Sequence, residues 1–558
     1  MALVLRLDVN FFDYTILAVY FALVIAIGVM ARRAIATSED FLLSGRSLPA
    51  WVTGLAFISA NLGAIEILGM AANGAQYGVS TVHFYWIGAV PAMVFLGIVM
   101  MPFYYGSRVR SVPEFLRRRF NAPTHLFNAW SFAAAAVLTA GVNLYALALV
   151  IHALIGWPTW LSIVVSAGFV LAYITLGGLS GAIYNEVLQF FVIIAGLVPL
   201  VVIGLNDVGG WSGLQRKINK PEFFNSWSGT HLGHWTNPLG DWFGIVMGLG
   251  FVLSFGYWTT NFAEVQRALS AKDLSAGQRT PLIGSFPKIF IPGLTIVPGL
   301  IAIAVLPKFG SAKGLAYNDA IPALMNKYLP NGTLGIALAG LLAAFMAGMA
   351  ANVSSFNTVF TYDIWQTYFV KDRPDRYYLT VGRVVTVVGI VIGIGTAFIA
   401  SGYTNIMNYI QLLFSYFNAP LFATFIIAMF WKRASPWAGV SGLAAGTLGA
   451  FLMHIFGFNI AYFYPGGHYD PTHATINVQM LNFYGAIVAF VADAVVTVAV
   501  SLVTKPKPVA ELAGLVYGVP DPDAPDPASI PKPKWWASPK ILGAISIGIT
   551  AVLSIIFV

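Results

Sequence analysis

The sequence predicts an all-α membrane protein of about fourteen transmembrane helices, and three observations lead to that fold class. Of the 558 residues, 58% are hydrophobic and 9% are charged, against roughly 25% charged in a soluble protein. Apolar runs long enough to cross a bilayer recur along the chain, without the short alternating segments of a membrane β-barrel. Two of these runs are interrupted near their middle by small and polar residues. A soluble multidomain enzyme does not fit this composition.

We predict each helix by one criterion, a run of about 20 apolar residues, because that length is needed to cross the hydrocarbon core. The first apolar run is too long for a signal-peptide core and follows Asp8 and Asp13 instead of basic residues, so we interpret it as the first membrane anchor. A tight junction is expected at Gly177-Gly178. The helices fall near residues 10–31, 50–71, 80–105, 123–155, 159–176, 178–205, 242–268, 280–308, 333–368, 378–402, 404–431, 435–457, 479–503 and 538–558.

The helices and loops divide the chain into seven segments, none of which is a soluble stretch long enough for a catalytic domain. Residues 504–537 alternate Pro with Asp and Lys, which is typical of an extended linker. The expected segments are an N-terminal flanking helix with the first cytoplasmic loop (1–49), a first five-helix repeat (50–205), an outer loop (206–241), a second, inverted five-helix repeat (242–431), flanking helices (432–503), the cytoplasmic linker (504–537) and a last transmembrane helix (538–558).

The distribution of Lys and Arg predicts the orientation, since cytoplasmic loops carry the positive excess. With the N-terminus outside, 21 of the 30 basic residues lie in inner loops, and Lys288 and Arg383 lie inside predicted helices. Both termini are therefore expected outside a cell (inner) membrane, and the net charge of +8 reflects topology instead of a nucleic-acid partner. The outer segments hold Arg6, Arg216, Lys217, Lys220, Lys308, Lys313 and Lys327.

The two interrupted helices point to a transporter of a small polar solute. One reads Ser59-Ala60-Asn61-Leu62-Gly63-Ala64-Ile65-Glu66 and the other Ser254-Phe255-Gly256-Tyr257-Trp258-Thr259-Thr260-Asn261. They lie five helices apart, and interruptions at matching positions of two repeats indicate a binding site near mid-bilayer. Unwound backbone is tolerated at that depth only where it lines a cavity or is buried in protein. The alternative is ordinary helix packing through small residues.

Ionisable residues inside predicted helices support a functional site, because each is costly in a bilayer unless it is paired or hydrated. Lys288 lies about 12 Å into its helix, close to the midplane. Glu66 lies in the interrupted second helix, and Glu186 lies a third of the way along the sixth. For Lys288 and Glu66 the alternative is a mutual ion pair that holds the helices together. Asp493 lies outside both repeats, so we expect it to be structural.

Several motifs resemble the sodium/solute symporters, the family that contains the sodium/glucose and sodium/galactose cotransporters. The most specific is Gly177-Gly178-Leu179-Ser180-Gly181-Ala182, followed by Asn185-Glu186 and Gln189, and the likeness extends over nearly the whole chain. The other motifs are Ser38 to Arg46, Ser59 to Met70, Ser111 to Leu116, Gln266-Arg267, Lys272 and Thr361-Tyr362-Asp363-Ile364.

This resemblance implies a leucine-transporter-like inverted repeat on helices two to eleven. It places substrate-binding positions at Asn61, Tyr257, Lys288 and Gln411, with Tyr257 as an inner gate that stacks on the solute. An apolar outer gate is implied at Met70, Phe84 and Met407.

Four positions depart from the sugar carriers of that family. Glu66 stands in place of Gln, Tyr85 in place of Glu, Gly88 in place of Ser and Ser254 in place of Asn. The carboxylate at position 66 partly restores the acceptor that is lost at position 85. A hydroxylated solute such as a hexose therefore remains the expected cargo.

The sodium site that the resemblance implies is incomplete. It would use the carbonyl groups of Ser59, Leu62 and Ala344, together with two hydroxyl side chains on the ninth helix. The hydroxyl positions correspond to Ala347 and Gly348, which carry no side-chain oxygen for a hard cation. Three alternatives follow: sodium coupling with water in place of the hydroxyls, proton coupling through Glu66 or Glu186, and uncoupled transport with Glu66 neutralised by Lys288. The family likeness favours a cation.

Functions of other classes fit less well. The chain has no cysteine and no phosphate-binding loop, zinc-ligand spacing or nucleophile elbow, so we expect neither an enzyme nor a cofactor beyond a coupling ion. A transporter-like solute sensor is the better rival, and uptake into vesicles separates the two. A cation channel conflicts with the buried Lys288. A proton-coupled or uncoupled carrier of a carboxylate or amino acid also remains open, as does the oligomeric state.

Overall fold

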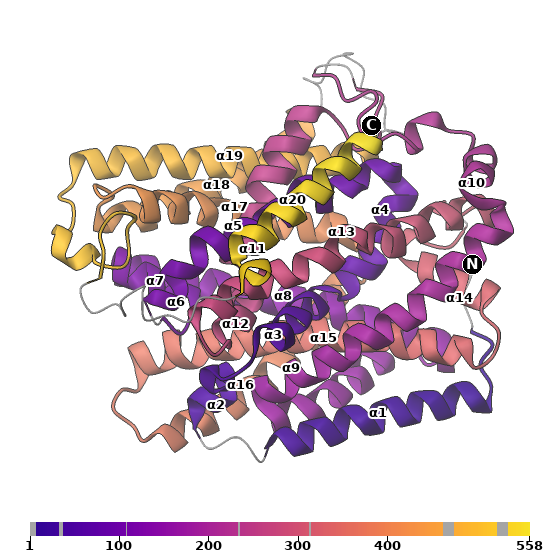
Figure 1. Ribbon diagram of the computed structural model, residues 1–558, viewed down its shortest axis with the longest axis horizontal. Coiled ribbons are helices and arrows are strands. Elements are labelled where there is room, and N and C mark those ends of the chain that lie inside the picture. Colours follow the sequence, from indigo (N-terminus) through magenta and orange to yellow (C-terminus); the bar gives the residue numbers. More distant parts are fainter. Residues whose placement is uncertain are drawn as a thin grey trace.

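The computed structural model describes residues 7–32, 37–107, 109–232, 235–311, 314–460, 474–521 and 534–557, and within them every long element is a helix (Figure 1). The all-α membrane fold is therefore confirmed. The long helices are α1 (Phe11–Arg32), α3 (Ala50–Asn61), α8 (Ala122–Ile155), α9 (Thr159–Val208), α13 (Leu274–Val305), α15 (Thr333–Thr358), α16 (Asp375–Ala400), α17 (Ile406–Phe430), α18 (Pro436–Ile460), α19 (Ala474–Val503) and α20 (Pro539–Ile556).

Among the described residues, eleven helices are long and apolar enough to cross a membrane, or thirteen if each of two bent pairs counts as one span. The element α9 holds more than one of the predicted spans. Its Phe169 contacts Phe21 of α1 with ring centroids 4.5 Å apart, and its Gln189 donates a hydrogen bond of 3.3 Å to the neighbouring Tyr20. A straight helix would separate Phe169 from Gln189 by about 30 Å, so the chain reverses between them. Fourteen spans nevertheless remain a prediction.

Both predicted interruptions are present. In the first, α3 ends at Asn61, and the chain bends by 56° before continuing through the π-helical turn η2 (Ile65–Gly69) and α4 (Met70–Tyr77). In the second, η7 (Gly244–Ser254) and α11 (Phe255–Thr260) end at Asn261, and α12 (Phe262–Leu269) leaves at 48°. Asn261 has extended backbone, and its side chain caps α12 by accepting a hydrogen bond of 3.0 Å from the Ala263 amide. A backbone amide at the start of α12 thereby has a hydrogen-bond acceptor inside the protein.

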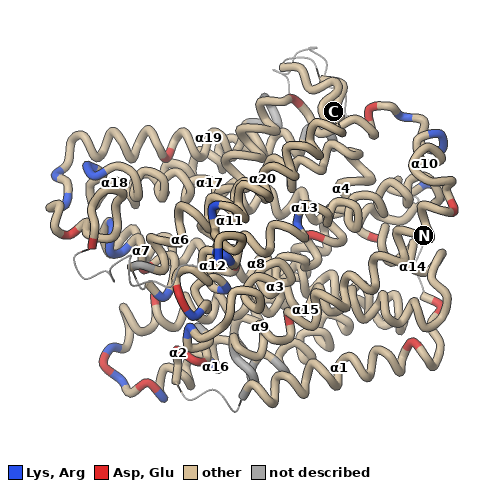
Figure 2. Tube along the Cα trace, in the orientation of Figure 1, with Lys and Arg blue, Asp and Glu red and all other residues tan. Residues whose placement is uncertain are grey.

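The helices outside the repeats lie on the periphery. In Figure 1, α1 follows the lower edge, α18 and α19 follow the upper edge, and α20 crosses the front. One face of the molecule carries the segment that follows α9. The start of α1, the start of α15 and the end of α20 lie at the same face. There Asp13 accepts hydrogen bonds from the Gly332 and Gly335 amides, each 2.7 Å long, and Ser226 contacts the Phe557 carbonyl. Figure 2 shows Lys and Arg gathered at the opposite end, near α7 and α18.

The criterion of about 20 apolar residues missed several short helices, because they are amphipathic and too short to cross the bilayer. They include α2 (Ser38–Leu43), α7 (Val112–Arg119), α10 (Gly210–Ile218) and α14 (Ala320–Tyr328). Arg119 of α7 is fully buried and donates three hydrogen bonds, 2.7 to 3.0 Å long, to carbonyl groups at and beyond the end of α17. The described start of the predicted linker also packs at this end, where Leu512 and Val516 are buried.

Candidate functional site

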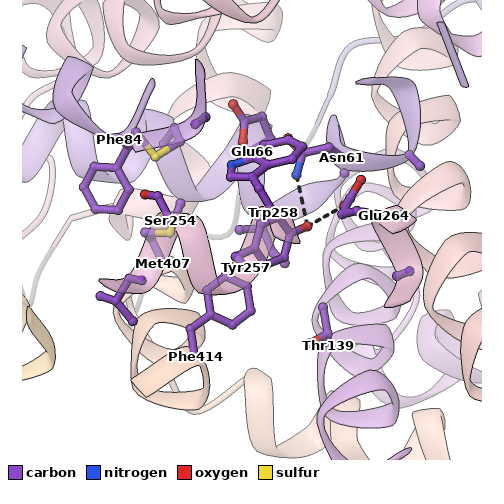
Figure 3. A pocket seen from close by; sticks show the side chains of 18 of the residues that line it. Asn61, Glu66, Phe84, Thr139, Ser254, Tyr257, Trp258, Glu264, Met407 and Phe414 are labelled. Atoms are coloured by element: carbon purple, nitrogen blue, oxygen red, sulfur yellow. Dashed lines mark hydrogen bonds between the residues drawn. The ribbon is translucent and has the colours of Figure 1, made fainter. Parts of the chain in front are cut away.

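A cavity lies between the two bends, and the space inside it that is open to water-sized molecules has a volume of about 80 Å³. All seven predicted substrate-binding residues line this cavity, and so do the three predicted outer-gate residues. The binding set is Asn61, Glu66, Tyr85, Ser254, Tyr257, Lys288 and Gln411, and the gate set is Met70, Phe84 and Met407. Their roles remain predictions, but the predicted grouping of these residues agrees with the geometry (Figure 3).

Lys288 is the cation at the centre of the cavity. The helix α13 begins at Leu274, six residues before its predicted start, so Lys288 lies near its midpoint. The ammonium group is 2.8 Å from Glu66 Oε1 and donates a hydrogen bond of 2.5 Å to Asn61 Oδ1. It also lies over the rings of Tyr85 and Trp258, 4.9 and 5.1 Å from their centroids. The lysine thus joins both broken helices, and its charge is compensated on several sides.

A second polar chain crosses the cavity from the same asparagine. Asn61 Nδ2 donates a hydrogen bond of 3.0 Å to Tyr257 Oη, which donates one of 2.6 Å to Glu264 Oε1 (Figure 3). Asn61 and Tyr257, two of the predicted substrate-binding residues, are therefore in direct contact. Glu264 was not among the predicted site residues, although it is 2% exposed and lies just after the second bend. The feature of the sequence that could have identified Glu264 is a carboxylate three residues after the helix-breaking Asn261.

The ring of Tyr257 separates two sides of the cavity. In Figure 3, Phe84, Ser254 and Met407 lie on one side of it, and Glu264 and Thr139 lie on the other. Phe414 packs against the Tyr257 ring with centroids 4.7 Å apart. The side that carries the gate residues is therefore apolar, and the opposite side is polar.

Three departures from the family pattern are explained by local packing. Tyr85 is 1% exposed, and its hydroxyl group is 2.8 Å from Thr295 Oγ1, so the ring presents its face and not its oxygen to Lys288. Gly88 leaves room for the neighbouring Ser254, because a β-carbon at position 88 would lie 2.2 Å from Ser254 Oγ. Ser254 Oγ donates instead to the Leu249 carbonyl at 2.8 Å. The serine and glycine therefore form a complementary pair.

The predicted sodium position has no side-chain oxygen at Ala347 or Gly348, and the amide oxygen of Asn143 lies beside it. Asn143 of α8 inserts its amide oxygen between the two segments that would hold the ion, and a β-carbon on either Gly63 or Gly348 would lie 2.4 to 2.5 Å from that oxygen. The same oxygen accepts a hydrogen bond of 2.9 Å from the Ala64 amide at the first bend. Of the six residues predicted for the ion, only Gly348 lines the cavity. Ser59, Leu62, Ala344 and Ala347 are fully packed.

Restoring the missing hydroxyl group tests this packing. Gly348→Ser is expected to destabilise the protein by about 1–3 kcal/mol, because its β-carbon meets the Asn143 side chain in a filled space. Thermal unfolding in detergent, followed by tryptophan fluorescence, measures the loss. Gly348→Ser combined with Asn143→Ala should recover most of the stability, and Gly168→Ser in an open position is the matched control. Full stability of Gly348→Ser alone would contradict the proposed role of Asn143.

Glu186, predicted as an ion or proton site, is engaged elsewhere. It is fully buried on α9 and forms a two-pronged ion pair with Arg267 of α12. Arg267 also donates a hydrogen bond of 2.9 Å to the Ala263 carbonyl and is itself fully buried. Asp493 lies away from the cavity, on α19, and accepts hydrogen bonds from Thr424 and Thr497 at 2.7 and 3.1 Å. These contacts agree with the expected structural role of Asp493, which stays a prediction.

Comparison with known proteins identifies the family. The sodium:solute symporter family matches residues 41–446. The chain is 29% identical to sodium/glucose cotransporter 4 of Homo sapiens, over 92% of this chain and 79% of the relative. It is 28% identical to the sodium/glucose cotransporter of Vibrio parahaemolyticus, over 78% of this chain and 84% of that protein.

A solved structure shares the fold. The substrate-bound, outward-open structure of a Na+-coupled sialic acid symporter superposes with a TM-score of 0.72 at 19% identity, covering 89% of this chain and 99% of the other. The predicted leucine-transporter-like architecture is confirmed by these similarities. The protein is a multi-pass secondary active transporter for a small solute, and it belongs to the sodium:solute symporter family.

Proposed function

We propose that this transporter moves a small, neutral, polyhydroxylated solute such as a hexose by alternating access, together with a coupling cation. The observation that carries the proposal is the cavity between the two bends, which combines aromatic faces with convergent polar groups. Tyr257 and Trp258 supply the faces, and Asn61, Lys288 and Gln411 supply donors and acceptors. Aromatic faces beside a few placed polar groups suit a sugar ring, which has an apolar face and hydroxyl edges.

Free hydrogen-bonding capacity supports a polar cargo. Gln411 is 4% exposed, yet its Oε1 has no hydrogen-bond partner among the described residues, and its Nε2 meets only the sulfur atom of Met407 at 3.4 Å. A buried amide without partners is costly, so a solute hydroxyl group at this position would restore a lost interaction. Glu66 and Asn61 would accept further hydroxyl groups once the solute draws Lys288 toward itself.

The gating roles follow from the same geometry. We assign Met70, Phe84 and Met407 to the outer gate, because all three are apolar side chains that line the cavity. Phe84 and Met407 lie on the side of Tyr257 away from Glu264 (Figure 3). We assign Tyr257 to the inner gate. Its hydroxyl group is held by Asn61 and Glu264, so rotation of the ring would break both hydrogen bonds.

We further propose that the protein lies in the cell membrane with both termini outside. The clustering of basic residues at the end near α7 and α18 in Figure 2 supports this orientation. A protease added to sealed vesicles of known sidedness would report which face is exposed.

Transport of radiolabelled D-glucose into proteoliposomes tests the solute class. Preloading the vesicles with unlabelled D-glucose should drive counterflow of the label, and D-galactose and D-mannose should compete with it. Vesicles with Trp258→Ala protein should lose about 5- to 150-fold in apparent affinity, if removal of the stacking face costs about 1–3 kcal/mol. Binding without any counterflow would identify a solute sensor instead, and no binding of any hexose would refute the sugar assignment.

A further inference from the structure

The buried charges near the cavity do not sum to zero. Glu66 is paired with Lys288 at 2.8 Å, and Glu186 is paired with Arg267. Glu264 is the third carboxylate of this group, and among the described residues no Lys, Arg or His forms an ion pair with it. With all five groups charged, the centre carries one uncompensated negative charge. An uncompensated charge inside a bilayer costs several kcal/mol, so this centre favours the binding of one cation.

The position of Glu264 makes it reachable from the cavity. It lines the cavity wall on α12, on the polar side of Tyr257. Its Oε1 accepts the Tyr257 hydroxyl at 2.6 Å, whereas its Oε2 has no hydrogen-bond partner within the described part of the chain. A carboxylate that is 2% exposed and has one oxygen without a hydrogen-bond partner among the described residues has an open place for a ligand.

The chemistry around that oxygen suits a proton better than a metal ion. A metal ion needs several ligands at once, and the described residues contain no group of three or more His, Cys, Asp or Glu side chains that could hold one. The family position is filled by the Asn143 amide and lacks both hydroxyl groups. A proton needs a single oxygen, and burial disfavours the charged form of a carboxylic acid.

We propose that Glu264 is the proton-binding residue that couples solute movement to a proton gradient, an inference that rests on the proposed transport of a hexose. On one face of the membrane, Glu264 Oε2 takes a proton from water and becomes a neutral carboxylic acid. On the other face the O–H bond breaks, the proton returns to water, and the carboxylate is restored. One proton moves per cycle, and no electron transfer is involved.

A continuous set of hydrogen bonds connects this proton to the solute position. Lys288 donates to Asn61, Asn61 donates to Tyr257, and Tyr257 donates to Glu264. When a solute engages Lys288 or Asn61, the hydrogen bond to Tyr257 changes, and with it the stability of the charged carboxylate. Binding of the solute and of the proton are thereby linked, and linkage acts equally in both directions.

The charged and titratable groups around Glu264 come from six elements, its own helix α12 included. Tyr104 and Tyr105 of α6 are engaged by backbone carbonyl groups, at 2.9 and 3.0 Å. The described helices α3 and α15, which also pack on α12, bring no acidic or basic side chain to it. The full set is Tyr104 and Tyr105 on α6, Glu66 on η2, Tyr257 on α11, Arg267 on α12, Lys288 on α13 and, behind Arg267, Glu186 on α9.

Proton movement in sodium-free vesicles tests the proposal. The full-length protein is reconstituted in phosphatidylcholine vesicles that contain a pH-sensitive dye, with choline in place of sodium. D-Glucose added outside should acidify the lumen with on the order of one proton per labelled solute. In Glu264→Gln that ratio should fall at least tenfold. Asp493→Asn removes a buried carboxylate outside the cavity, so it is the matched control and should keep the wild-type ratio.

A readout without solute separates this proposal from the solute assignment. The infrared carbonyl stretch of a protonated carboxylic acid should titrate with pH in the wild-type protein and in Asp493→Asn, and that titrating component should be missing in Glu264→Gln. If the component is present but D-glucose does not move, the sugar assignment fails and the proton site stands. If D-glucose uptake requires sodium and the Glu264→Gln protein keeps the wild-type proton ratio or infrared titration, the proton proposal is overturned.

Discussion

Lys288→Ala is expected to abolish measurable binding of D-glucose. The substitution removes the donor to Asn61 Oδ1, the ion pair with Glu66 and the cation above Tyr85 and Trp258 in one step. Truncating one partner of a buried, hydrogen-bonded charge pair costs about 2–5 kcal/mol, which corresponds to roughly a 30- to 5,000-fold loss of affinity. Scintillation proximity or calorimetric binding to purified protein measures the change.

A paired variant keeps this result interpretable, because Lys288→Ala also leaves Glu66 as a buried carboxylate without its cation. Lys288→Met combined with Glu66→Gln removes both charges at similar volume and should recover folding stability. Binding should remain lost in the double variant, since the donor to Asn61 is still missing. Wild-type affinity in either variant would show that the lysine only holds the helices together.

Arg267→Ala is expected to have the largest effect on stability, about 3–5 kcal/mol, because it leaves a fully buried carboxylate without its partner. Arg267 is the link between α12 and α9, through Glu186, and it also bonds the Ala263 carbonyl within its own helix. The expected result is a lower unfolding temperature and a smaller yield of monodisperse protein, measured by fluorescence-detected size exclusion after heating.

Two further variants show whether the loss comes from burial. Arg267→Met with Glu186→Gln should restore much of the stability, because neither side chain is then left charged in a low-dielectric interior. Arg118→Ala removes a half-exposed arginine that pairs with Glu114 at 2.6 Å, and it should cost less than about 1 kcal/mol. Equal destabilisation by Arg118→Ala and Arg267→Ala would argue against a special role for the buried pair.

The helices, both bends and the residues that line the cavity are predicted well from the sequence, because each depends on local chemistry. Apolar length identifies membrane spans, and each bend falls at an asparagine, with Asn61 ending α3 and Asn261 capping α12. The reversal within α9 near Gly177-Gly178 was also expected from sequence. Conversely, α7 and α14 were missed because a length criterion for apolar runs ignores short amphipathic helices.

The functional residues that could not be predicted from the sequence owe their roles to packing between segments that are far apart in the chain. Glu264 was expected near the end of the interrupted helix at 242–268, and the 48° bend at Asn261 brings its carboxylate to the cavity wall. The pairing of Glu186 with Arg267 joins residues 81 positions apart. Asn143 lies in a mostly apolar helix, and its role appears only where Gly63 and Gly348 approach it. Local patterns contain none of these three relations.

The pairing of Lys288 with Glu66 also acts as an electrostatic filter on cargo. An organic acid would compete with Glu66 for the same ammonium group while facing the charge of Glu264, and an amine would meet Lys288 at short range. A neutral molecule encounters neither repulsion, because the lysine and glutamate cancel each other before it arrives. Under the proposed function, we therefore expect the cavity to favour a neutral solute over an acid of the same size.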